Sequence, residues 1–229
     1  MKIGVIGGFG PETTAEFYMS IVNKNRASGK AHPDILIHNV PVPFELERSA
    51  VRDGKNLDDF LPFLLESTRL LNETCDIIAL PCNTLHIFID DIRKASRKPV
   101  LSILEETSKE IKRRKFSKLG ILATTKTAES RILESKLDGV QVLKPDARRQ
   151  SRLSEIIHFV LQGKVSQKMK NEIICMIKDF EINGAQCVIL GCTDLQLVVK
   201  QFDVGIPLID TMDVLANSII NISKCDNNG

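Results

Sequence analysis

Two short apolar runs, each ending in a cysteine, constrain the fold of this chain more than any other feature. The runs cover residues 76–81 and 186–191, and they lead into Cys82 and Cys192. A short run rich in β-branched residues is typical of a strand buried on both faces of a parallel sheet. Polar residues follow each cysteine, so each thiol is expected at a strand-to-helix junction. In open α/β sheets, ligands bind outside the carboxyl ends of the strands.

The cysteine runs belong to a longer internal repeat. Residues 3–6 match residues 119–122 at an offset of 116, and the two cysteines match at 110. A third landmark, Pro99-Val100-Leu101, matches Pro207-Leu208-Ile209 at 108. Three landmarks in the same order at nearly constant spacing indicate a duplicated unit. The repeat therefore predicts two equivalent strand ends that face each other across one cleft.

The alternation of strand and helix patterns predicts an α/β fold. We expect two pseudo-symmetric, doubly wound lobes with mainly parallel sheets and the active site in the cleft between them. The first lobe is assigned to residues 1–100 plus 210–229, and the second to residues 101–209. A helix is expected after each cysteine, a loop around Arg48, and a polar loop at residues 124–127.

Composition excludes several classes of function. The chain has 229 residues, 43% of them hydrophobic and 26% charged, which is ordinary for a soluble globular protein. A net charge of +2 gives no nucleic-acid footprint, and no apolar stretch approaches the ~20 residues that span a bilayer. No signal-peptide pattern precedes the first strand, so we predict a cytoplasmic protein with reduced thiols. Six cysteines without a Cys-x-x-Cys pair make a zinc site unlikely to form, and no metal is expected.

The two junction cysteines are candidates for a pair of acid/base groups. A lone thiol is only a few per cent thiolate at neutral pH, but a helix N-terminus stabilises the anion and lowers its pKa. The alternative is that Cys82 and Cys192 are small core residues, since cysteine is among the most buried types. Their matched positions favour the catalytic interpretation. The polar residues that follow them can cap a helix or contact a ligand: Asn83, Thr84, Thr193 and Asp194.

A glycine-rich loop follows the first strand. Gly8-Phe9-Gly10 begins like a dinucleotide fingerprint, but Thr13 stands at the third glycine position and no acidic residue closes the second strand. A nicotinamide site is therefore not expected. Backbone amides at Gly8 are instead predicted to be free for a carboxylate. The equivalent loop of the second half carries hydroxyls that can bind substrate or cap a helix: Thr124, Thr125 and Thr127.

These motifs resemble those of the aspartate/glutamate racemase superfamily, and most of all its aspartate racemase branch. The resemblance runs over nearly the whole chain and is carried by these segments: Gly7-Gly8-Phe9-Gly10-Pro11-Glu12-Thr13-Thr14, Pro81-Cys82-Asn83-Thr84, Leu122-Ala123-Thr124-Thr125, Gly191-Cys192-Thr193-Asp194 and Pro207-Leu208-Ile209-Asp210. The resemblance implies a cofactor-independent enzyme in which one cysteine removes the α-proton and the other delivers a proton to the opposite face.

The resemblance also implies that Arg48 and Lys164 hold the carboxylates of the substrate. From the sequence alone, Arg48 is a surface charge and Lys164 a lysine that complements a helix C-terminus. Three positions depart from the pattern of the branch, where glutamate is usual at Asp194, methionine at Phe9 and a small or apolar residue at Glu12. These departures bear on the choice of substrate more than on the reaction.

We therefore predict an isomerase that racemises an acidic amino acid, aspartate first and glutamate second, as a cytoplasmic homodimer without cofactor, metal, nucleic-acid or membrane partner. Two alternatives stay open. One is another enzyme on the same scaffold, such as a maleate-type isomerase, a hydantoin racemase or a decarboxylase. The other is a non-catalytic protein that binds amino acids.

Overall fold

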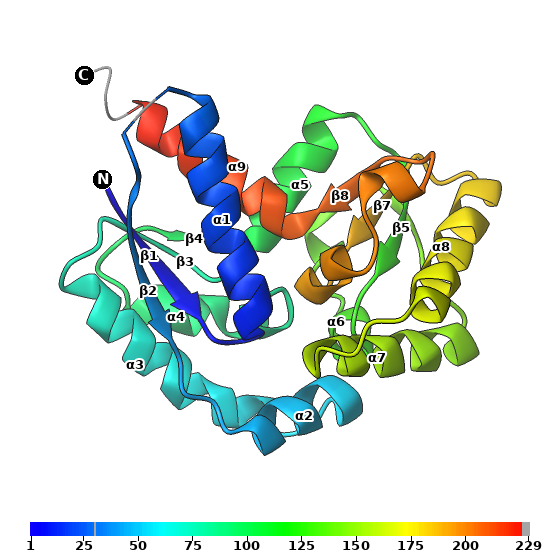
Figure 1. The fold of residues 1–229 in the computed structure, drawn as a ribbon, viewed down its shortest axis with the longest axis horizontal. Coiled ribbons are helices and arrows are strands. Elements are labelled where there is room, and N and C mark those ends of the chain that lie inside the picture. Colours follow the sequence, from blue (N-terminus) through cyan, green and yellow to red (C-terminus); the bar gives the residue numbers. More distant parts are fainter. Residues whose placement is uncertain (30, 226–229) are drawn as a thin grey trace.

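The fold contains two four-stranded sheets in which every pair of neighbouring strands is parallel (Figure 1). The structure is a computed structural model and describes residues 1–29 and 31–225, without the side chains of residues 48, 51–53, 224 and 225. The first sheet has the order β2-β1-β3-β4. Its strands are β1 (Lys2–Gly7), β2 (Asp34–Asn39), β3 (Ile77–Ala79) and β4 (Val100–Leu101).

The second sheet repeats the same order as β6-β5-β7-β8. Its strands are β5 (Lys118–Leu122), β6 (Gln141–Leu143), β7 (Cys187–Leu190) and β8 (Leu208–Asp210). In each sheet the strand before a cysteine motif, β3 or β7, lies between the first strand of its lobe and the last. The predicted α/β class with two parallel-sheet lobes is confirmed, and the internal repeat is a repeat of topology.

Helices surround both sheets. The α-helices are α1 (Pro11–Ala27), α2 (Phe44–Asp53), α3 (Leu61–Asn72), α4 (Ile89–Ala95), α5 (Ile103–Arg113), α6 (Thr125–Ser130), α7 (Ala147–Leu161), α8 (Gln167–Ile182) and α9 (Thr211–Cys225). Short 3-10 helices are η1 (Leu57–Phe60), η2 (Thr84–Phe88), η3 (Glu134–Lys136), η4 (Thr193–Leu197) and η5 (Gln201–Asp203). None of the helices in the described part of the chain is both long and apolar enough to cross a membrane.

Three local expectations are wrong. Arg48 lies within α2 and not in a loop, because the prolines at 41 and 43 precede a helix whose first turn carries Glu45 and Glu47, which suit its positive end. Each cysteine is followed first by a 3-10 helix. After η2 the expected α-helix forms as α4, whereas after η4 the β-branched pair at 198–199 gives no further α-helix. The polar loop at 124–127 is instead the start of α6, with Thr124 as its N-cap.

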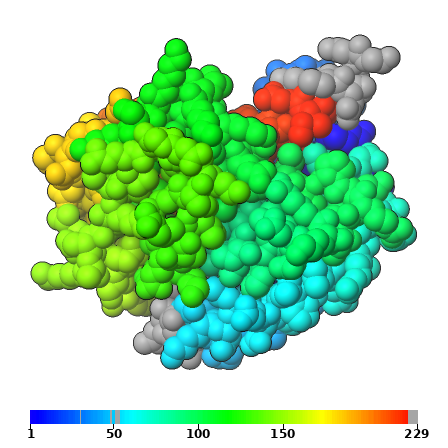
Figure 2. Space-filling view, turned by 180° about the vertical axis from the view of Figure 1, so that it is seen from behind, coloured from blue at the N-terminus to red at the C-terminus, as the bar shows by residue number. Residues whose placement is uncertain are grey.

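A single buried cluster joins the two lobes. It contains Ile3 of β1, Ile121 of β5 and Leu215 of α9, each at most 4% exposed. Helix α9 packs against both α1 and α5, and Figure 1 shows these three helices side by side between the sheets. Figure 2 shows the opposite face, where the cyan part of the first lobe lies against the green part of the chain. The residue boundaries that we assigned to the lobes stay a prediction.

Candidate active site

One pocket brings the two cysteine motifs together. Cys82 follows β3 and Cys192 follows β7, and both line the same pocket, with Asn83, Thr193 and Asp194 beside them. The equivalent strand ends of the two lobes therefore meet at one site, because both sheets place the cysteine strand at the same position in the strand order. The repeat predicts that the two thiols share one site, and both line this pocket, while their catalytic role stays a prediction.

The thiol of Cys192 is bonded to the carboxyl group of Asp194. Its Sγ donates to Asp194 Oδ2 at 3.4 Å, and both residues are less than a tenth exposed. Burial raises the pKa of Asp194 to about 7, with further raising by the nearby Glu47 and Glu12, while the bond from Cys192 opposes the shift. A carboxyl group that titrates near neutral pH can exchange a proton with the thiol beside it.

Burial is also the largest influence on the pKa values of the two thiols. The pKa of Cys82 is raised to about 12 by desolvation, which the backbone amides of Leu85 and Thr84 offset only in part. The pKa of Cys192 is raised well above its ordinary value by desolvation first and by Asp194 second. The backbone amides lower both thiol pKa values, as expected at a helix start, but the loss of water outweighs them, so each pKa is raised overall.

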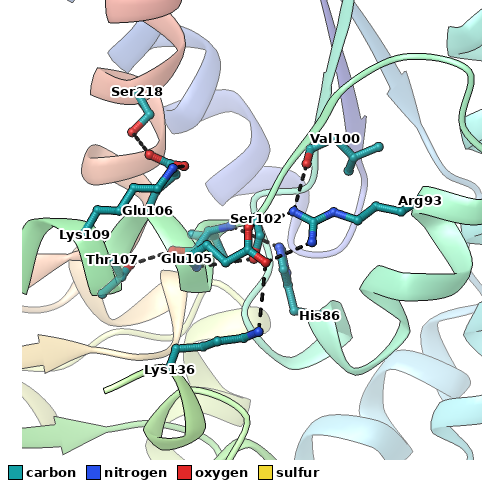
Figure 3. Close-up of polar contacts among 11 residues, drawn as sticks. His86, Arg93, Val100, Ser102, Glu105, Glu106, Thr107, Lys109, Lys136 and Ser218 are labelled. Carbon is teal, nitrogen blue, oxygen red and sulfur yellow. Dashed lines mark hydrogen bonds and ion pairs between the residues drawn. The ribbon is translucent and has the colours of Figure 1, made fainter. Parts of the chain in front are cut away.

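A histidine fixes the backbone at Cys82. His86 is 2% exposed, and its Nε2 lies 3.1 Å from the backbone N–H of Ile103 at the start of α5. Because that N–H can only donate, Nε2 accepts and the proton sits on Nδ1, which donates to the carbonyl oxygen of Cys82 at 2.7 Å. Burial lowers the pKa of His86 to about 4. Figure 3 shows His86 beside Ser102, the N-cap of α5.

The surroundings of His86 are held by ion pairs. Arg93 of α4 forms a two-pronged pair with Glu105 of α5, and it also donates to the carbonyl of Val100 in β4 (Figure 3). Lys136 of η3 adds a longer contact to Glu105 at 4.0 Å. These contacts fix the start of α5, and with it the group that orients His86.

Two hydrogen bonds tie the cysteine motifs to each other. Asn83 donates from Nδ2 to Thr211 Oγ1 at 2.9 Å, and Thr211 donates to the carbonyl oxygen of Leu190 at 3.2 Å. Asn83 follows Cys82 directly, and Leu190 lies two residues before Cys192. Thr211 is fully buried at the start of α9. The last helix of the chain therefore couples the two strand ends that carry the thiols.

The predicted threonines divide into two groups. Thr84, Thr124 and Thr127 form a hydroxyl triad, with Oγ1 atoms 2.9 Å apart for Thr84 and Thr127 and 3.0 Å apart for Thr124 and Thr127. Thr84 and Thr124 line the pocket. Thr127 lies behind them, and Thr125 faces away and bonds to Ser154 at 2.8 Å.

The amides of the glycine loop already have partners. The backbone N–H of Gly8 donates to Thr14 Oγ1 at 3.1 Å, and that of Gly10 donates to Glu47 Oε1 at 3.1 Å. The expectation that these amides are free for a substrate carboxylate is therefore wrong. Gly8 has a φ of 91° and lies against the backbone of Val40, so a side chain at this position would collide with that backbone.

Arg48 and Lys164 are the residues expected to bind the substrate carboxylates, and the structure describes the side chain of Lys164 alone. The side chain of Arg48, on α2, lies outside the described residues. Lys164 is exposed beyond the end of α7, donates to Gln162 Oε1 at 3.0 Å and does not belong to the pocket lining, whereas Leu161 does.

The sequence predictions do not include most of the apolar residues that line the pocket, nor the acidic residue Glu47. Glu47 lines the pocket, and its pKa is raised by burial first, against the bond from Gly10. Its contact with a loop 37 residues away has no local sequence signal. The apolar lining residues are Phe9, Ala50, Leu57, Phe60, Leu85 and Leu161. Within the described residues, no group of three or more side chains is arranged to hold a metal ion.

Comparison with known proteins identifies relatives of this arrangement. The profile described as "Asp/Glu/Hydantoin racemase" matches residues 6–219. The chain is 28% identical over 227 residues to a broad specificity amino-acid racemase, RacX, of Bacillus subtilis (strain 168), and the match covers 96% of each chain. Its fold is similar to that of an aspartate racemase homologue from Pyrococcus horikoshii OT3, with a TM-score of 0.80, 26% identity and coverage of 97% and 99% of the two chains.

A further solved structure, the aspartate racemase of Picrophilus torridus, matches with a TM-score of 0.77 and 22% identity. The match covers 97% of this chain and 94% of that one. At this identity the likeness supports the two-lobed fold.

Proposed function

The chain belongs to the Asp/Glu/hydantoin racemase family, and on this premise we propose that it racemises an amino acid through Cys82 and Cys192. The observation that carries the proposal is that two thiols from equivalent strand ends line one pocket. One thiolate removes the α-proton and becomes a thiol, while the opposite thiol donates its proton to the other face of the α-carbon and becomes a thiolate. The proton count is balanced, and the reverse reaction exchanges the two roles.

The thiols need help to ionise, because burial raises both pKa values. We propose two sources. Asp194 lies at hydrogen-bond distance from Cys192 and titrates near pH 7, so it can accept the thiol proton. The α-ammonium of a bound amino acid places a positive charge near both sulfurs, and a nearby opposite charge favours the ionised form.

The finer expectation, an acidic substrate with aspartate before glutamate, has the resemblance as its support. It depends on Arg48 and Lys164, and Lys164 is exposed outside the pocket lining. The homodimer, the cytoplasmic location and the independence from cofactors also stay predictions. Sedimentation at micromolar concentration tests the dimer, and a monomer would contradict it.

Solvent deuterium tests the two-base reaction. In heavy water each turnover should place deuterium on the product α-carbon, observed by mass spectrometry with chiral chromatography. Cys82→Ser and Cys192→Ser should lower racemisation at least about a hundredfold, because a hydroxyl is a far weaker acid than a thiol. Each variant should keep α-exchange for one enantiomer only, and the two variants should differ in that enantiomer.

The matched control is Cys175→Ser, since Cys175 is an exposed cysteine of α8 away from the site. It should keep full activity. Unimpaired racemisation in either active-site variant would show that a single base suffices, and the proposed mechanism would then be wrong.

A further inference from the structure

The pocket that holds the thiols has a mainly apolar wall. Six of its lining side chains are apolar: Phe9, Ala50, Leu57, Phe60, Leu85 and Leu161. From this wall we propose that the substrate is an amino acid with an apolar side chain, of the leucine, methionine or phenylalanine kind. The inference rests on the proposed racemase function and names the substrate class of the same site.

Both lobes contribute to the wall, and it is packed. The ring of Phe9, from the glycine loop, lies 5.8 Å from that of Phe60 between centroids, tilted by 50°. Phe60 and Leu57 are 3% and 7% exposed. Leu161 comes from α7, which packs against α2 of the first lobe. Figure 1 shows α2 and α7 side by side at the edge where the lobes meet. The apolar surface is therefore a built part of the pocket.

The charges on the wall oppose an acidic side chain. Among the lining residues whose side chains the structure describes, the charged ones are Glu47 and Asp194. Glu47 is one of the causes that raise the pKa of Asp194, in addition to the larger effect of burial. A side-chain carboxylate, in addition to the α-carboxylate that every amino acid carries, would increase this repulsion.

The same carboxyl groups are placed for the α-carbon end of the substrate. Asp194 contacts Cys192, and Glu47 is anchored by the backbone N–H of Gly10. Groups beside the thiols are positioned for the α-ammonium that every amino acid carries, which leaves the apolar wall for the side chain.

The C-terminal end of α7 contributes an apolar residue to the pocket and not a cation. Helix α7 presents Leu161 to the pocket, while Lys164, three residues later, is exposed and bonded to Gln162. Leu161 is thus part of the wall, while Lys164, which the resemblance assigns to a substrate carboxylate, lies outside the pocket lining. In hydrophobic pockets, one methylene changes catalytic efficiency about 10- to 200-fold.

The test compares kcat/KM of the full chain for L-leucine, L-methionine, L-phenylalanine, L-aspartate, L-glutamate and L-lysine by chiral chromatography. The best apolar substrate should exceed aspartate and lysine by about tenfold or more. Leu161→Lys brings a cation into the wall and should lower the leucine-to-aspartate ratio about tenfold. Leu161→Ala should also lower that ratio, because the pocket loses apolar contact, so the test does not depend on one variant folding.

The control is Leu70→Lys, the same change at a leucine of α3 that is 51% exposed, and it should leave the ratio unchanged. A preference for aspartate, glutamate or lysine would overturn the inference while the racemase proposal stands. If neither these six amino acids nor any other amino acid tested exchanges its α-proton with solvent, the proposed racemase function itself fails. Unfolding curves confirm that each variant is folded.

Discussion

The Nδ1 atom of His86 donates a hydrogen bond to the carbonyl oxygen of Cys82 over 2.7 Å, while the opposite nitrogen accepts from Ile103. One imidazole therefore connects the end of β3 to the start of α5. The hydrogen bond to this carbonyl fixes the position of the Cys82 backbone, and with it the position of the thiol.

His86→Ala should lower kcat more than it changes KM, because the thiol loses its fixed position while the pocket wall remains. It leaves a buried donor and a buried acceptor without partners, at about 1–3 kcal/mol each in free energy of unfolding. Urea denaturation and steady-state kinetics measure the two effects. His32→Ala, at an exposed histidine, is the control. Unchanged kcat in His86→Ala would refute the positioning role.

Asp194 predicts a distinctive pH dependence of stability. Its pKa is raised from 3.8 to about 7 in the folded chain, so between these values the native state holds a proton that the unfolded state has released. Its contribution is complete below about pH 4 and is lost as the pH rises through 7. At about 1.4 kcal/mol per pKa unit, the effect amounts to a few kcal/mol.

Asp194→Asn removes this titration. The difference in free energy of unfolding between this variant and the wild type should therefore change between pH 4 and pH 8, with the wild type losing stability relative to the variant. Asp58→Asn, at an exposed aspartate, serves as the control. A difference that is constant over this range would contradict the raised pKa.

Activity should survive removal of small molecules and metals. The proposed reaction uses two thiols and a carboxyl group, so dialysis against a chelator and against carbonyl reagents should leave the racemisation rate within about twofold. Loss of activity that a divalent metal or pyridoxal phosphate restores would contradict the two-thiol mechanism.

Lys164→Met should change kcat/KM by less than threefold for every substrate, because this lysine is exposed and lies outside the pocket lining. A charge-assisted hydrogen bond to a substrate carboxylate is worth roughly 1.5–3 kcal/mol, which corresponds to at least about tenfold. Arg48→Met is measured in parallel. A tenfold loss on aspartate in Lys164→Met would restore the clamp that the resemblance implies.

The two lobes should differ at one pair of equivalent glycines. A Cβ atom on Gly120 of β5 would lie 2.2 Å from Phe180, whereas one on Gly4 of β1 would lie 3.0 Å from the sulfur of Cys75. Gly120→Ala should therefore cost about 1–3 kcal/mol of unfolding free energy through overpacking, and Gly4→Ala less. Urea midpoints that fall equally in both variants would show that Phe180 moves aside freely.

The sequence predicts much of this architecture because the informative signals are local. Buried β-branched runs identify β3 and β7, and their repeat spacing predicts that Cys82 and Cys192 meet. The apolar wall is different, since Leu57 and Phe60 have the pattern of any helix interior until tertiary packing turns them toward the thiols. The contact of Glu47 with Gly10 spans 37 residues and has no local pattern.

Two other features depend on balances that a sequence does not specify. The thiol pKa values follow from desolvation by the whole fold, which outweighs the amides of the local turn. The packing of the whole fold decides which residues near the end of α7 face the pocket. Leu161 faces the pocket and Lys164 faces solvent, although they are only three positions apart.

Helix α9 comes long after β1 in the chain, yet it completes the buried cluster to which β1 contributes. Leu215 and Ile219 share one buried cluster with Ile3 and Val5, and Lys24 of α1 forms an ion pair with Asp213 at 2.7 Å. During synthesis, β1 and α1 leave the ribosome long before their covering helix exists. The apolar face of β1 and α1 therefore stays uncovered until α9 has emerged, so these early residues reach their final packing only after residues 211–225 have been synthesised.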